Sequence, residues 1–173
     1  KGGASFKDWS LPYTTGVLRE SLRTTPPAGG GFRIARKPIR IGGFDVEEGV
    51  VVTADPRIGN KDPELFPSPE DFKPERWISA NGGSSSAFSS AAGSCPFTGT
   101  ATSLPAGGWF PAGTGKHQCP GVPLAELCAK VLLAKWVDKF ESWDEANGPP
   151  DMILVPIKLP KDSYMMSLKA RSY

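Results

Sequence analysis

The chain has 173 residues, and its 20 lysines and arginines nearly balance 18 aspartates and glutamates, for a net charge of +2. So small a charge gives no indication of nucleic-acid binding or of a polybasic membrane site, and no apolar run reaches the roughly 18 residues that a transmembrane helix needs. The three cysteines, Cys95, Cys119 and Cys128, show no paired spacing, which argues against a disulfide framework. Zinc is a remote alternative, because a four-ligand site would need all three and the single histidine.

The first predicted element is a short helix over residues 12–23. Ser10 can cap it, Pro12 suits its first turn, and two consecutive prolines beyond its end stop it. Glu20 and Arg23 lie three residues apart, so both side chains project from one face of this helix. Their spacing alone is typical of an exposed ion pair that adds little stability.

A β-rich stretch follows between residues 32 and 52. Apolar and basic side chains alternate along residues 32–36 and 38–41, as they do in short strands. Glycines at positions 42, 43 and 49 mark turns, and the valines at 50–52 predict a buried strand. Arg33 falls in the first of these strands, where an exposed charge is its ordinary role.

The next segment ends in Pro74-Glu75-Arg76-Trp77 and is followed by an insertion at residues 79–108. Glycine, serine and alanine dominate this insertion. Such a composition cannot bury enough apolar surface to order itself, so we expect a mobile or externally supported segment.

A glycine-rich loop at residues 112–121 carries a single cysteine and leads into an amphipathic segment. Because Gly113, Gly115 and Gly121 have no side chain, the loop can turn tightly and lie against a flat ligand. Cys119 precedes the predicted helix, where unpaired N–H groups and the positive end of the helix dipole stabilise a negatively charged sulfur. Taken alone, however, a cysteine in such a turn is most often a small buried residue.

The segment at residues 122–140 predicts a long helix. Its apolar residues recur at steps of three and four and form a stripe that we expect to face the core, with charged side chains opposite. The stripe comprises Leu124, Leu127, Cys128, Val131 and Leu132, and the opposing charges are Glu126, Lys130 and Asp138. Trp136 and Phe140 are predicted to continue the core, and residues 152–157 and 164–168 to form late strands.

Three of these motifs resemble the signatures of the cytochromes P450 and occur in the family's order. Residues 20–23 resemble the Glu-x-x-Arg helix motif, and residues 74–77 resemble the Pro-Glu-Arg-Phe-like turn. The loop at residues 112–121 resembles the haem-binding loop Phe-x-x-Gly-x-Arg-x-Cys-x-Gly. It departs from that pattern at two positions, because His117 stands in place of the arginine and Ala112 in place of the phenylalanine. Trp109 or Phe110 could replace the missing aromatic ring.

The resemblance implies an α+β fold, namely the C-terminal part of the cytochrome P450 fold. Its expected parts are the Glu-x-x-Arg helix, a small antiparallel sheet, a meander, the Cys loop, a long helix and a C-terminal hairpin. Residues 1–173 would form this region as an incomplete domain, with the insertion at residues 79–108 inside it. A whole P450 is more than twice as long, and nothing in this chain matches its oxygen-activating helix.

The resemblance also assigns site residues. Cys119 would ligate the iron of haem b, with Gly113, Gly115 and Gly121 keeping the loop close to the ring. Arg33 and His117 would pair with the haem propionates. Glu20, Arg23 and Arg76 would form a buried charged network that fixes the loop beneath the haem, since two guanidinium groups can satisfy one carboxylate.

By resemblance, the chain is the proximal half of a haem-thiolate monooxygenase that acts on an apolar substrate. The run at residues 26–33, Pro-Pro-x-Gly-Gly-Gly-Phe-Arg, is similar to the retinoic-acid and carotenoid-related branch and suggests an isoprenoid. The implied partners are the rest of a P450 chain and a reductase or ferredoxin, and we expect no activity from this chain alone.

The alternative is a P450-derived, non-catalytic structural subunit docked in a larger assembly. The cellular location stays open. Membrane association, at the endoplasmic reticulum or a plastid, would come through segments or partners outside this chain.

Overall fold

The computed structural model describes residues 11–78, 109, 111–113, 115–145, 148, 150–154, 158–160 and 165–172. The predicted insertion at residues 79–108 lies outside the described residues, as do Ser10, Cys95 and Phe110.

In the part of the chain that the structure describes, helices and strands are largely segregated, as in an α+β fold: four strands follow α1 and four more follow α3. The helices are α1 (Pro12–Thr24), α2 (Pro56–Gly59) and α3 (Val122–Lys139), with the short 3-10 helices η2 (Pro74–Trp77) and η3 (Gly115–His117). The strands are β1 (Gly31–Ile34), β2 (Ile39–Ile41), β3 (Phe44–Val46), β4 (Val51–Ala54), β5 (Phe140–Glu145), β6 (Met152–Leu154), β7 (Lys158–Pro160) and β8 (Met166–Ala170).

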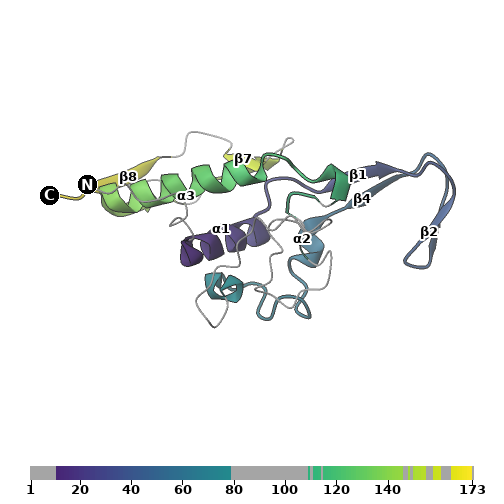
Figure 1. Cartoon of the computed structure of the whole chain (residues 1–173), viewed down its shortest axis with the longest axis horizontal. Coiled ribbons are helices and arrows are strands. Elements are labelled where there is room, and N and C mark those ends of the chain that lie inside the picture. The colour runs from purple at the N-terminus through teal and green to yellow at the C-terminus, as the bar shows by residue number, and fades with distance from the viewer. Residues whose placement is uncertain are drawn as a thin grey trace.

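Within the described residues, the strands pair only as two-stranded antiparallel sheets. The pairs are β1 with β4, β2 with β3, β5 with β8 and β6 with β7. The β2–β3 hairpin extends away from the body of the molecule, as Figure 1 shows. Helix α1 lies between α3 on one side and η2 on the other (Figure 1). No helix of the described part is long and apolar enough to cross a bilayer.

Helix α1 begins at Pro12, as predicted, but its capping position is one residue after the predicted Ser10. Leu11 occupies the capping position with φ 32° and makes no side-chain capping bond, while Pro12 opens the first turn as expected. The helix packs closely on η2 at Gly16, where a Cβ atom would stand 2.6 Å from the carbonyl oxygen of Pro74. This contact leaves room for glycine only.

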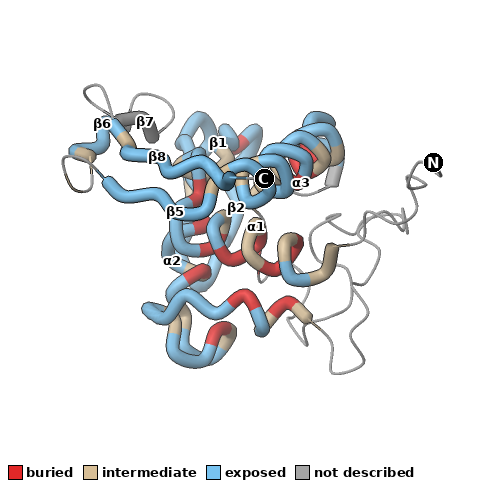
Figure 2. Tube along the Cα trace, turned by 90° about the vertical axis from the view of Figure 1, so that its left-hand side faces the viewer, coloured by how far each residue is buried: buried red, intermediate tan, exposed pale blue. Residues whose placement is uncertain are grey.

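The hydrophobic core sits where α1, the meander (residues 60–77) and the start of α3 meet. Phe66, Trp77, Trp109 and Val122 are buried there, and Trp77 lies with ring centroids 4.5 Å from Trp109 and 6.0 Å from Phe66. Figure 2 shows buried positions along α1 and the meander, whereas the C-terminal strands are exposed. Trp109 is therefore part of the core.

Two predictions about burial were wrong. The valine strand, β4, is exposed, with Val51 at 57%, because its sheet has only two strands and no described layer covers it. Helix α3 shows the reverse of the expected orientation: Leu124 and Leu132 are 66% and 63% exposed, while Glu126 and Lys130 are buried. The cause is that α3 packs on α1 through its charged face.

The C-terminal segment has the late strands that the sequence predicts, with two additions, β5 and β7. Strands β6 and β8 fall within or next to the predicted ranges, and β6 forms a hairpin with β7. Strand β5 was not predicted, and it pairs with β8. Trp136 and Phe140 are half-buried, and their tilted rings have centroids 5.0 Å apart outside the main core, so they do not continue it.

Candidate functional site

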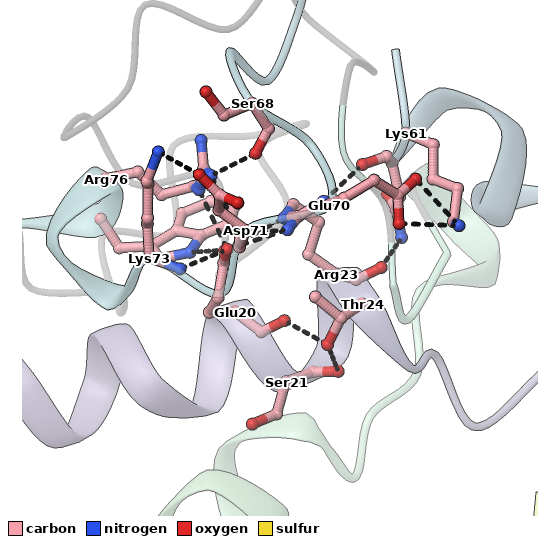
Figure 3. Close-up of polar contacts among 12 residues, drawn as sticks. Glu20, Ser21, Arg23, Thr24, Lys61, Ser68, Glu70, Asp71, Lys73 and Arg76 are labelled. Atoms are coloured by element: carbon pink, nitrogen blue, oxygen red, sulfur yellow. Dashed lines mark hydrogen bonds and ion pairs between the residues drawn. The ribbon is translucent and has the colours of Figure 1, made fainter. Parts of the chain in front are cut away.

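The centre of the candidate site is the carboxylate of Glu20, which is completely buried. Its Oε1 accepts hydrogen bonds from Arg23 Nη2 at 2.9 Å, Lys73 N at 2.9 Å and Arg76 Nε at 3.1 Å. Its Oε2 accepts from Arg23 Nε at 3.0 Å and Trp77 Nε1 at 2.8 Å. The structure thus brings Glu20, Arg23 and Arg76 together, as Figure 3 shows.

Electrostatics around this carboxylate favour its charged form. Burial by itself raises the pKa of the Glu20 carboxyl group, because desolvation penalises the charge. Hydrogen bonds from Arg23, Lys73 and Trp77, with the positive charge of Arg23, outweigh that effect and lower the pKa below its ordinary value. The carboxylate therefore stays ionised in the folded protein at neutral pH.

Arg23 connects α1 to the meander through further contacts. Its Nη1 donates to the carbonyl oxygen of Asn60 at 2.8 Å and its Nη2 to that of Asp71 at 3.2 Å, while Asn60 Nδ2 donates back to the carbonyl oxygen of Arg23 at 2.9 Å. The guanidinium group also lies 5.5 Å from the centre of the Phe66 ring. Asn60 was missed by sequence reasoning, because a single asparagine carries no local signal of such a role.

The cysteine loop lies against the same core. The backbone N–H of Cys119 donates to the carbonyl oxygen of Ala112 at 2.9 Å, which closes the loop. Gly113 adopts φ 75°, a left-handed conformation that favours glycine, and a Cβ there would meet the carbonyl oxygen of His117 at 3.0 Å. The Cys119 side chain is exposed, contrary to the buried role typical of a lone cysteine.

Contacts run continuously from the Glu20 network to this loop. Trp77 donates to Glu20 from its indole nitrogen and packs against Trp109 with its ring. Ala112 and Val122, at the two ends of the cysteine loop, belong to the same packed cluster. The loop is therefore supported by a core that is itself fixed by a buried charge network. Trp77 takes part in this network although its residue type gave no indication of it.

The two predicted propionate partners are exposed. Arg33 on β1 donates from Nη1 to the carbonyl oxygen of Phe32 at 2.7 Å, and His117 ends η3. Both side chains are accessible to a ligand. Among the described residues, no group of three or more His, Cys, Asp and Glu side chains could hold a metal ion by itself. A metal bound at Cys119 would thus need most of its ligands from elsewhere.

Comparison with known proteins decides the family. The family model described as "Cytochrome P450" matches residues 7–168. The chain belongs to the cytochrome P450 family. This match confirms the relationship that the three motifs predict. The fold of the C-terminal P450 part, an α+β fold, is confirmed by the similar solved structure, retinoic acid-bound CYP120A1.

Relatives of this family match nearly the whole chain but only part of their own length. The chain is 30% identical to "Putative cytochrome P450 120" from Synechocystis sp. over 91% of this chain and 32% of that protein. It is 29% identical to "Cytochrome P450 26A1" from Xenopus laevis over 92% of this chain and 28% of that protein. The structure of retinoic acid-bound cyanobacterial CYP120A1 matches with TM-score 0.76 and 29% identity, over 98% of this chain and 35% of that one. The chain thus spans about a third of the length of these P450 relatives.

Proposed function

We propose that this chain supplies the proximal wall, with the cysteine ligand, of a haem-thiolate monooxygenase site. The observation that carries the proposal is the exposed Cys119 side chain on a closed loop that rests on the Glu20-supported core. An exposed sulfur held by a rigid backbone can bind an iron centre without reorganising the fold. The P450 family membership gives the chemistry to which this geometry is suited.

The residues around Cys119 would leave room for a planar group held through the cysteine sulfur. A Cβ atom at Gly121 would stand 3.7 Å from the cysteine Sγ, so glycine keeps the space beside the sulfur open. Gly113 and Gly115 add no side chain on the approach to the loop. Arg33 and His117 are exposed, and we assign them to the carboxylates of the haem propionates.

Haem b, when bound through a cysteine thiolate, supplies oxygen activation, because the thiolate donates electron density that favours O–O cleavage. The chain's own contribution is positioning. Cys119 would hold the iron through its sulfur, the Ala112 contact keeps the loop closed, and the buried Glu20 carboxylate with Arg23 and Arg76 keeps the underlying core in place. Electrons would arrive from a reductase or ferredoxin.

For the substrate, we propose an apolar, extended isoprenoid. The support is the similarity to a cyanobacterial structure that holds retinoic acid, together with the Pro-Pro-x-Gly-Gly-Gly-Phe-Arg run. We expect the residues that select among such substrates to lie in the part of a P450-type chain that has no counterpart here. That part makes up about two thirds of the matched relatives.

A chimera tests the proposal. This chain would replace the matched third of the Synechocystis relative, and the reduced protein would be examined under carbon monoxide for a thiolate-type Soret band. We expect the band in the chimera and in Cys128→Ser, and its loss in Cys119→Ser. A thiolate-type band that survives Cys119→Ser refutes the assignment. A folded chimera with no haem band supports the alternative, a non-catalytic structural subunit.

A further inference from the structure

Asn60 lies at the end of α2 and makes two hydrogen bonds with one residue of α1. Its side-chain Nδ2 donates to the carbonyl oxygen of Arg23 at 2.9 Å, and its own carbonyl oxygen accepts from Arg23 Nη1 at 2.8 Å. Both bonds are buried, since Asn60 is 1% and Arg23 is 2% exposed. The two residues are therefore joined by a reciprocal pair of hydrogen bonds, which we call the Asn60–Arg23 pair.

The side-chain half of this pair completes the C-terminal end of α1. The last four carbonyl groups of an α-helix have no partner within the helix. Arg23 is the penultimate residue of α1, so its carbonyl oxygen is one of these, and Asn60 Nδ2 supplies the donor. A buried carbonyl oxygen without a donor would be costly. The amide of Asn60 thus caps α1 from a segment 37 residues further along the chain.

The backbone half of the pair sets the direction of the Arg23 guanidinium group. Arg23 presents Nε and Nη2 to the two carboxylate oxygens of Glu20, at 3.0 and 2.9 Å (Figure 3). The third nitrogen, Nη1, donates to the carbonyl oxygen of Asn60. Because a guanidinium group is planar and rigid, a fixed position for Nη1 also fixes how the other two nitrogens meet the carboxylate. The contact with Asn60 therefore acts on Glu20 through Arg23.

The chemistry of the pair restricts the residue type at position 60. The backbone N–H of Asn60 donates to the carbonyl oxygen of Pro56 at 2.9 Å, so α2 holds the residue from one side and Arg23 from the other. An asparagine side chain can donate and carries no charge, whereas ionised aspartate has the same shape and can only accept. A carboxylate here would also attract the guanidinium group away from Glu20. The position thus needs the donor of asparagine and not only its volume.

We propose that Asn60 is a positioning residue, which orients Arg23 on Glu20 and thereby keeps the core beneath the cysteine loop in its working geometry. The last step rests on the proposed function, because the geometry of the loop matters to a ligand of Cys119. The orientation of Arg23 is a property of this chain by itself. The two parts can therefore be tested separately.

Nitrogen NMR of the arginine side chains tests the first part in the isolated chain, with the Arg23 signals assigned through its backbone. We expect resolved, slowly exchanging Nη signals for Arg23. In Asn60→Ala and Asn60→Asp, rotation of the guanidinium group should become faster by about tenfold or more, the equivalent of about one lost hydrogen bond. Ile58→Ala is the matched control, because Ile58 lies on the same short helix but is 76% exposed, and it should leave the Arg23 signals unchanged.

The aspartate variant separates positioning from two other roles. If Asn60 only filled space, Asn60→Asp would behave like the native chain. If it only offset the positive charge of Arg23 and Arg76, Asn60→Asp would slow the rotation further. Either result overturns the proposal. Should the variants not fold, the unsubstituted chain still decides, because the side-chain amide protons of Asn60 should exchange slowly with water, and rapid exchange would likewise overturn it.

The chimera with the Synechocystis relative tests the second part. Asn60→Ala and Asn60→Asp should reduce its thiolate-type Soret band at a temperature where circular dichroism shows an intact fold, and Ile58→Ala should not. An undiminished band in both Asn60 variants would refute the link to the cysteine loop. A chimera that lacks the band before any substitution, beside faster Arg23 rotation in Asn60→Ala, would reject the proposed function and keep Asn60 as the residue that orients Arg23.

Discussion

Replacing Glu20 with glutamine tests whether the buried network holds the fold together. Glutamine has the shape of glutamate but offers one acceptor oxygen where the carboxylate offers two. Oε1 now serves three donors and Oε2 serves two, so even the better orientation of the amide leaves two donors without an acceptor. Each buried unsatisfied donor costs about 1–3 kcal/mol. The charge of Arg23 also loses its buried partner, so we expect Glu20→Gln to cost about 3–5 kcal/mol of unfolding free energy.

Thermal unfolding followed by circular dichroism provides the assay. For a chain of this size, a loss of about 3–5 kcal/mol corresponds to a fall in melting temperature of roughly 6–20 °C. Glu70→Gln is the matched control, because Glu70 pairs with Lys61 at 3.1 Å on the surface, where an ion pair adds little. If Glu20→Gln melts at the same temperature as Glu70→Gln, the carboxylate is not the element that fixes α1 to the meander.

Three further predictions follow from the same contacts. The folded pKa of Glu20 lies below the unfolded value of 4.5, so the unfolded state binds more protons between the two values. The difference in unfolding free energy between the native chain and Glu20→Gln should therefore be full above pH 4.5 and become smaller as the pH falls through the folded pKa. Acid titration of urea unfolding would reveal this change. Gly16→Ala should destabilise the chain despite a gain of about 1 kcal/mol in helix propensity, because its Cβ would stand 2.6 Å from Pro74 O; a raised melting temperature would contradict the packing described. The isolated chain should bind added haem weakly and show no turnover, since one wall buries only part of the ring, at about 25 cal/mol per Å²; tight binding in a spectral titration with coupled turnover would show a self-sufficient enzyme.

Local sequence patterns predicted the elements that depend on nearby residues. The helix at α1, the antiparallel pairs around glycine turns and the long helix at α3 all follow from spacing, proline and glycine positions. The Glu-x-x-Arg and Pro-Glu-Arg-Trp motifs also indicated which side chains would meet. Glu20 and Arg76 lie 56 residues apart along the chain, so spacing alone gave no indication that they meet and suggested only an exposed pair of Glu20 with Arg23. Resemblance to a family supplied the missing distance information.

Only the tertiary structure decided which faces are buried. The periodicity of residues 122–139 predicts that α3 has an apolar face and a charged face, but it does not predict which face packs on α1. The contacts of α3 with α1 place Glu126 and Lys130 inside and leave Leu124 and Leu132 exposed. The roles of Asn60 and Trp77 were likewise unpredictable, because a buried carboxylate recruits whichever donors folding brings within reach. Sequence thus determined most of the elements and the charged members of the network, whereas long-range packing determined the uncharged members, the partners of each group and which faces are exposed.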